Sequence, residues 1–167
     1  MNTINVLLAE LEQEAAATER VLARVPQEHL SWRPHPKSFS LGQLAMHVAT
    51  IPGHIAQLAS VDSFDMPAPS AQPEAASTAE LVPAMRASVA KARELLGEFD
   101  DAKMAELWRM TAGGREIMAM PRAALARTVM LNHWYHHRGQ LLVYLRLHDV
   151  PVPSVYGPTA DENPFTA

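Results

Sequence analysis

The chain has 167 residues, 48% of them hydrophobic, which is typical of a single globular domain over residues 1–167. The absence of cysteine excludes disulfides, thiolate metal ligands and a cysteine nucleophile, and no apolar run approaches the roughly 18 residues that a membrane span needs. Because the net charge is −4, the Lys and Arg residues are scattered and the first segment is acidic, we expect a cytoplasmic protein that binds neither nucleic acid nor membranes.

Apolar residues at three- and four-residue spacing predict a first helix over residues 3–24. The other face of this helix is largely filled by glutamates, Glu10, Glu12, Glu14 and Glu19. Ser40 and Gln43 form a capping-box pattern that predicts the start of a second helix. Within that helix, Pro52 and Gly53 predict a kink or an end.

A Pro- and Ala-rich connection over residues 61–78 has no periodicity and predicts a long loop. Ser77 and Glu80 repeat the capping-box pattern and predict a third helix over residues 78–96.

Two adjacent glycines, Gly113 and Gly114, separate two short runs and predict a small β-hairpin. Pro121 suits the first position of a fourth helix, which we expect to reach Leu147 or His148. Helices joined by one short loop, one long loop and one hairpin predict an all-α four-helix bundle with a hairpin before its last helix.

The fourth helix carries a second apolar stripe, which lies 100–180° from His133 when each residue advances the helix by about 100°. A helix that is apolar on two sides is either central or used in oligomerisation. We therefore expect a homodimer packed partly on this stripe, which consists of Leu131, Trp134, Leu142 and Leu145.

Three of the eight histidines, His133, His136 and His137, fall within five residues of the fourth helix. His133 and His137 lie one turn apart on the same face, as in zinc-binding helices with histidines at positions i and i+4. By the same helical stepping, Gln140 and Tyr144 lie within about 20° of His133, and His136 lies at the edge of this face. Such a polar patch within an apolar stripe must be satisfied by partners or by a metal.

Two segments carry a resemblance to a known family: WRPHPKSFSLGQLAMHVA at residues 32–49 and NHWYHHRGQLLVYLRLHDVPVPSVYGP at residues 132–158. They resemble the DinB/YfiT-type family of damage-inducible four-helix-bundle proteins, and the likeness spans nearly the whole chain. This group includes the DinB-like domains of mycothiol-dependent isomerases and bacillithiol transferases. In the family, one histidine of the second helix and two of the last coordinate a divalent metal. The resemblance therefore implies a metal site made of His47, His133 and His137.

The resemblance implies zinc or nickel as the metal, and three neutral imidazoles leave an open position for water, as in catalytic zinc sites. It implies either a metal-dependent hydrolase or a thiol-dependent S-transferase with a low-molecular-weight thiol as cosubstrate. The small-molecule substrate is not named by the sequence. A metal-binding or stress-response protein without catalysis is the alternative, and a bundle that has kept only the fold is the third hypothesis.

Ligand imidazoles need acceptors for their other ring nitrogens, and Gln43 and Gln140 are the candidates. Tyr144 is expected to donate to a substrate oxygen. His136 is expected to make an outer contact of the site or a dimer contact rather than to bind the metal.

No Asp or Glu lies near the histidine face of the fourth helix, so the general base is missing unless Asp161 or Glu162 of the tail folds over the site. His54 is expected to be exposed or near the mouth of the site, and because it shares a helix face with His47 it is the alternative to His47 as a ligand. Arg138 points away from the histidines and is expected to form a salt bridge or cap a carbonyl. The remaining histidines are expected at the surface: His29, His35 and His148.

Overall fold

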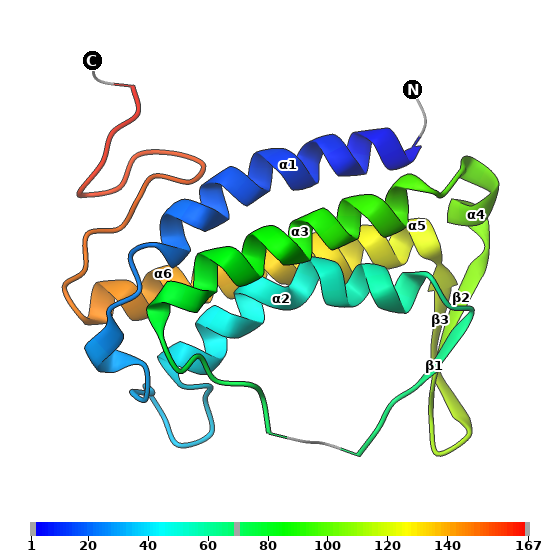
Figure 1. The fold of residues 1–167 in the computed structure, drawn as a ribbon, viewed down its shortest axis with the longest axis horizontal. Coiled ribbons are helices and arrows are strands. Elements are labelled where there is room, and N and C mark those ends of the chain that lie inside the picture. The colour runs from blue at the N-terminus through cyan, green and yellow to red at the C-terminus, as the bar shows by residue number, and fades with distance from the viewer. Residues whose placement is uncertain (1–2, 69–70, 166–167) are drawn as a thin grey trace.

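Helices dominate the computed structural model, which describes residues 3–68 and 71–165 (Figure 1). The long helices are α1 (Thr3–Leu22), α2 (Leu41–Ala59), α3 (Leu81–Gly97) and α6 (His133–Leu147). The shorter helical elements are η1 (Gln27–His29), η2 (Thr78–Glu80), α4 (Asp101–Ala105), α5 (Arg122–Ala124) and the π-helix η3 (Leu125–Asn132). Helix α2 packs between α3 and the η3–α6 segment, and α1 contacts α3 and α6.

The predicted helices are confirmed in position, and both capping boxes are present. The Ser40 hydroxyl accepts from the Gln43 N–H at 3.1 Å, and the Gln43 side chain accepts from the Ser40 N–H at 2.9 Å. The last helical segment has the predicted extent, but its middle, η3, is π-helical. A regular bundle of four continuous helices therefore stays a prediction.

Pro52 does not end α2, because neighbouring helices replace the hydrogen bonds that this residue disrupts. Pro52 has no N–H to donate to the Val48 carbonyl, which accepts instead from the Trp134 indole N–H at 2.7 Å. The Gly53 N–H donates to the Ser88 hydroxyl of α3 at 2.8 Å. A Cβ atom on Gly53 would lie 2.8 Å from the Ser88 carbonyl oxygen, so glycine permits the close approach of α2 and α3.

A small sheet lies at one end of the helices, with strand order β1-β2-β3 (Figure 1). Strands β2 (Leu107–Ala112) and β3 (Arg115–Pro121) form the predicted antiparallel hairpin. Gly113 and Gly114 join them at φ values of 58° and 79°, the left-handed region that a tight hairpin turn requires. Strand β1 (Ser63–Asp65) pairs parallel to β2, so part of the predicted 61–78 loop is a strand.

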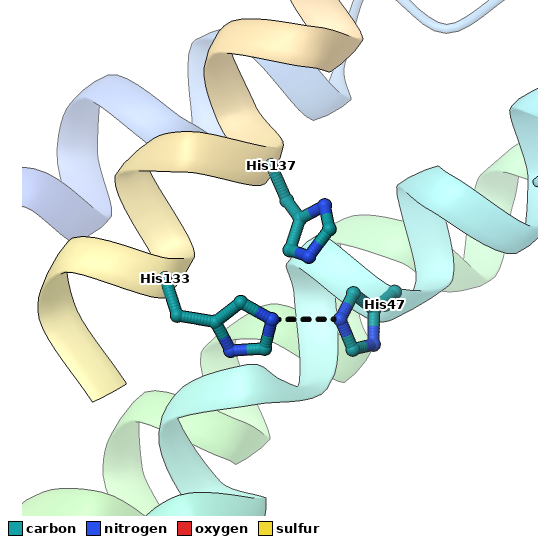
Figure 2. A group of neighbouring side chains, drawn as sticks. All are labelled: His47, His133 and His137. Atoms are coloured by element: carbon teal, nitrogen blue, oxygen red, sulfur yellow. Dashed lines mark hydrogen bonds between the residues drawn. The ribbon is translucent and has the colours of Figure 1, made fainter. Parts of the chain in front are cut away.

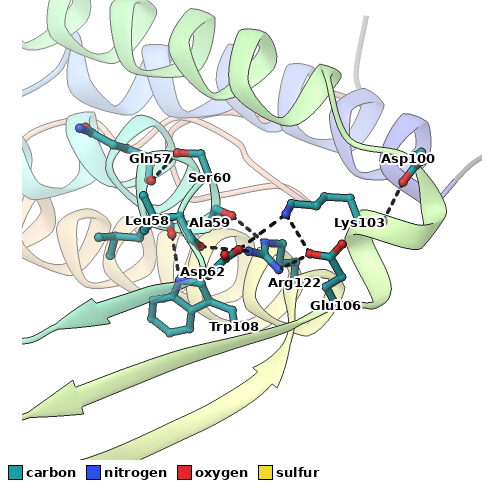
Figure 3. Close-up of polar contacts among 11 residues, drawn as sticks. Gln57, Leu58, Ala59, Ser60, Asp62, Asp100, Lys103, Glu106, Trp108 and Arg122 are labelled. Carbon is teal, nitrogen blue, oxygen red and sulfur yellow. Dashed lines mark hydrogen bonds and ion pairs between the residues drawn. The ribbon is translucent and has the colours of Figure 1, made fainter. Parts of the chain in front are cut away.

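Arg122, which follows strand β3, forms hydrogen bonds with the C-terminal end of α2 and so joins the sheet to that helix (Figure 3). Its side chain is 1% exposed. The guanidinium donates to the Ala59 carbonyl at 2.9 Å, the Val61 carbonyl at 3.1 Å and the Asp62 carboxylate at 2.6 Å. It also donates to Glu106 at 3.1 Å. This one side chain thus satisfies backbone carbonyls that the end of α2 leaves without helical donors.

A second buried arginine, Arg138, joins α6 to α1. It is 2% exposed and forms a 2.6 Å ion pair with Glu14, and it also donates to the Glu14 carbonyl and the Thr18 hydroxyl. The predicted salt bridge of Arg138 is confirmed. The prediction that Glu14 belongs to the polar face of the first helix is wrong, because Glu14 is 6% exposed and faces α6.

The second apolar stripe of the last helix is used inside the chain. Leu131, Trp134 and Leu145 are each 0% exposed, so their covering comes from neighbouring helices and not from a second copy. Leu142, the fourth residue of the stripe, is half-buried, and the homodimer stays a prediction. None of the helices in the described part of the chain combines the length and apolar character needed to cross a bilayer.

Candidate metal centre

Three imidazoles converge between α2 and α6 (Figure 2). His47 comes from α2, whereas His133 and His137 occupy successive turns of α6, and one ring nitrogen of each lies within 4.8 Å of the others. The ring centroids are 4.5–5.2 Å apart, with the rings edge to face. All three side chains are half-buried. The structure therefore brings together the three histidines that the sequence analysis singled out as ligands.

Oxygen acceptors orient the two rings of α6. The His133 Nδ1 lies 3.2 Å from the Val129 carbonyl oxygen, and the His137 Nδ1 lies 2.7 Å from the Gln140 Oε1. Because these oxygens can only accept, each Nδ1 carries the proton and each Nε2 keeps its lone pair. Metal-binding histidines are usually held in this way, with the distal nitrogen fixed by a carbonyl or carboxylate.

Burial keeps the three imidazoles neutral. Burial, followed by the charges of the neighbouring His137, His133 and His54 rings, lowers the pKa of His47 to about 4. Burial also lowers the pKa of His133 and of His137, against the opposing effects of their hydrogen bonds to Val129 and Gln140. Neutral imidazole is the form that binds a metal ion, so protons compete weakly for this site at neutral pH.

The donor set fits a divalent transition metal. The Nε2 atoms of His47 and His133 are 3.4 Å apart. Two nitrogen ligands about 2.0–2.1 Å from a tetrahedral zinc ion lie about 3.4 Å from each other. A ring-to-ring hydrogen bond of the same length would be weak and would serve only two of the three rings. Imidazole nitrogens suit zinc, nickel, cobalt and iron.

A cavity of about 220 Å³ lies beside His137. Its lining consists of Lys37, Ser38, Phe39, Leu44, His137, Gln140 and Tyr144. The Phe39 ring lies 5.7 Å from the His47 ring and 6.4 Å from the His137 ring, centroid to centroid. The sequence analysis missed Lys37 and Phe39. The signal for Phe39 was its place before the Ser40 cap, where an apolar residue commonly packs on the fourth residue of the helix, here Leu44.

The supporting residues proposed from the sequence fall in different places. Gln140 contacts His137, and the Tyr144 hydroxyl lies 3.4 Å from the Phe39 carbonyl in the cavity wall. Gln43 is used in the helix cap, and its amide nitrogen donates to the Gln72 carbonyl. His136 is exposed, with its ring centroid 4.9 Å from that of His137.

Five other residues with a predicted place lie apart from the metal centre. The alternative ligand His54 is exposed and lines a groove between α2 and α3. Asp161 forms an ion pair with Arg146, and Glu162 forms one with Arg20, so neither carboxylate folds over the histidines. His148 is half-buried and stacks on His29 with ring centroids 4.1 Å apart, so these two histidines are not simple surface residues.

No carboxylate joins the three histidines: in the described part of the chain, their cluster is the only group of three or more potential metal ligands. A general base within the site is therefore still missing.

Comparison with known proteins shows what the chain as a whole is similar to. A model described as the DinB family matches residues 1–164. The Bacillus subtilis protein YrdA, described as uncharacterized, is 28% identical over 162 residues, covering 96% of this chain and 92% of YrdA. The crystal structure of a DinB-like protein from Bacillus cereus ATCC 10987 has a TM-score of 0.68 and 26% identity, and the match covers 90% of this chain and 95% of that one. A structure of a DinB-family member from Exiguobacterium sibiricum has a TM-score of 0.64 over 92% of this chain and 97% of its own, and at 17% identity it shows the shared fold alone.

Proposed function

Because this chain belongs to the DinB family and holds three neutral imidazoles within reach of one ion, we propose that it binds a divalent metal ion through His47, His133 and His137. The observation that carries the proposal is the convergence of three ring nitrogens within 4.8 Å from two separate helices. Polar groups inside a protein normally have good hydrogen-bond partners, whereas these half-buried ring nitrogens face one another, with one long contact of 3.4 Å between His47 and His133. Zinc and nickel are the metals that the donor set suits well.

Three neutral imidazole ligands with an open coordination position are the ligand set of catalytic zinc sites. A divalent cation bound there would supply Lewis acidity, which lowers the pKa of a coordinated water or thiol. The chain itself would contribute three neutral ligands, with the Val129 carbonyl and Gln140 holding the two α6 rings in place. The Phe39 ring lies beside two of the three imidazoles, His47 and His137.

Of the two reaction classes, a thiol-dependent S-transferase is favoured over a hydrolase, because no carboxylate of the described residues joins the histidine cluster. Bulk water has a pKa of about 15.7, whereas a free thiol has a pKa of about 8.5 and gives up its proton far more readily. A hydrolase would benefit from a carboxylate that accepts a proton, and Asp161 and Glu162 are engaged with arginines elsewhere. The alternative is a metal-binding protein without catalysis.

Metal binding is tested with purified, metal-free protein titrated with zinc against a competing chromophoric chelator. We expect one zinc per chain in the wild type and a loss of affinity of at least about 100-fold in His133→Ala, because one of three ligands is gone. The matched control is His35→Ala, which removes an exposed histidine outside the cluster. Equal zinc affinity in the two variants would contradict the proposed site.

Catalysis is tested with zinc-loaded protein and panels of esters, amides and electrophiles, the last with low-molecular-weight thiols. We expect thiol-dependent turnover of an electrophile in the wild type and none in His133→Ala. Zinc binding without turnover in any panel would favour the non-catalytic alternative.

A further inference from the structure

Among the described residues, the cavity beside His137 has one charged side chain at its edge, the exposed Lys37. None of these lining residues is Asp or Glu. Three neutral imidazoles would leave the charge of a bound divalent ion uncompensated, because no carboxylate belongs to the ligand cluster within the described residues. An anionic molecule would neutralise both charges, whereas a cation would be repelled.

Several polar side chains of this cavity can donate hydrogen bonds, among them Gln140, Tyr144 and Lys37. The Ser38 hydroxyl can both donate and accept. The Gln140 Oε1 is occupied by His137 at 2.7 Å, which leaves the amide N–H groups of Gln140 for another acceptor. The Tyr144 hydroxyl makes only a long 3.4 Å hydrogen bond to the Phe39 carbonyl. It can therefore donate to a bound ligand instead at little cost. Lys37 adds a charged donor. An ionised carboxylate only accepts hydrogen bonds, so it matches this set.

The rest of the cavity is apolar and partly aromatic. Leu44 is 1% exposed, and the Phe39 ring forms a wall beside the imidazoles. The Tyr144 ring is held edge to face against Trp32, with centroids 5.4 Å apart. A volume of about 220 Å³ is small beside the roughly 300–1,000 Å³ of common ligand sites. These walls therefore suit a small, flat or short apolar body.

Resting on the metal site proposed above, we infer that this cavity binds a small carboxylate with an aromatic or short alkyl body. Lys37, Gln140 and Tyr144 recognise the carboxylate, and Phe39 and Leu44 contact the apolar part. The substrate, or one of two substrates, of the centre is then a carboxylic acid.

The probe is benzoate, compared with its neutral isostere benzamide. Both are titrated by calorimetry into the zinc-loaded and the metal-free wild type, and the methyl groups of Leu44 are followed by NMR. We expect benzoate to shift the Leu44 signals and to bind about tenfold or more tightly than benzamide, because hydrogen bonds to a charged group are the stronger ones.

Two lysine variants locate the anion. Lys37→Met should weaken benzoate binding at least about fivefold and leave benzamide binding unchanged. The control is Lys91→Met, because Lys91 lies in the groove between α2 and α3, donates to Gln57 and should not affect benzoate. Equal effects of the two substitutions, or equal affinity for benzoate and benzamide, would overturn the inference.

The metal titration separates this inference from the proposed function. If zinc binds but benzoate leaves the Leu44 signals unchanged, the carboxylate site is wrong and the metal centre stands. If zinc does not bind, the metal centre is wrong. Benzoate binding to the metal-free protein that Lys37→Met weakens would then still support the carboxylate site, and the lack of such binding would contradict it. If inorganic phosphate displaces benzoate with equal affinity, the cavity binds anions in general and the assignment to carboxylates is overturned.

Discussion

The arginine cluster around Arg122 and the histidine cluster around His47 are both polar groups placed among packed helices, yet they differ in how they are satisfied. The Arg122 guanidinium donates to two backbone carbonyls and two carboxylates (Figure 3). The three imidazoles turn like groups toward one another (Figure 2). A cluster that pairs its own donors and acceptors stabilises the fold, whereas a cluster of facing acceptors is incomplete without a ligand. Substitutions in a cluster like that of Arg122 should therefore lower the free energy of unfolding, whereas substitutions in the histidine cluster should weaken metal binding.

The largest effect is expected at the other buried arginine. Arg138→Met removes one partner of a buried ion pair and leaves the Glu14 carboxylate without its charge partner. Breaking such a pair typically costs about 3–5 kcal/mol of unfolding free energy, which urea denaturation measures.

The double variant Glu14→Leu with Arg138→Met is the control for that loss. It removes both charges and should recover a large part of the stability, because a well-packed apolar pair often replaces a buried ion pair at little cost. A loss below about 1 kcal/mol in Arg138→Met alone would mean that the pair behaves like an exposed one and that the contrast fails.

The histidine cluster should show the opposite behaviour. Zinc at about 100 times its dissociation constant should raise the unfolding free energy of the wild type by about 2.7 kcal/mol, because it binds the folded chain. His47→Ala should abolish this increase and change the metal-free stability little, since the ring is half-buried and makes no strong bond within the chain. A large loss of metal-free stability in His47→Ala would mean that the histidine cluster stabilises the fold, as the arginine cluster around Arg122 does.

Features formed by residues close together in sequence were the most predictable parts of the fold and of the histidine cluster. The two capping boxes and the Gly113-Gly114 turn depend on residues within three positions of each other, and they formed as expected. The pairing of His133 with His137 follows from the helical repeat in the same way. The contribution of His47 came from the family resemblance, because no local pattern links it to α6.

The parts that could not be predicted depend on distant partners or on the backbone. Glu14 looked like a surface residue because its partner Arg138 is 124 residues away. Strand β1 has three residues, too few for an alternating pattern, and it exists through pairing with β2. The Val129 carbonyl that orients His133 has no side-chain signal at all. An apolar stripe likewise predicts that one face of a helix is buried, but it does not predict which helix packs against that face.

Gln43 and Gln140 were both expected to accept a hydrogen bond from a ligand imidazole, but their substitutions should now have different effects on zinc binding and on stability. Gln140→Leu removes the acceptor of the His137 Nδ1–H and should weaken zinc binding about tenfold, the usual effect of losing such a partner. Gln43→Leu removes one half of the Ser40 capping box and should cost about 1 kcal/mol of stability with zinc affinity unchanged. Calorimetry and urea denaturation on both variants measure the two quantities. If Gln43→Leu weakened zinc binding as much as Gln140→Leu, the division between binding and stability would not hold.

The smallest effect is a pH dependence of the metal-free protein. His47 has a pKa of about 4 in the folded chain, chiefly because of burial, against 6.5 for an ordinary histidine. The unfolded chain therefore binds a proton more readily at this position, so the contribution of His47 to stability is fully present above about pH 6.5 and declines as the pH falls toward 4. NMR should show a neutral His47 ring at pH 5.5, and urea denaturation should show a smaller stability loss between pH 7 and pH 5.5 in His47→Asn than in the wild type. An identical dependence of unfolding free energy on pH in the two proteins would contradict the burial of a neutral His47 imidazole.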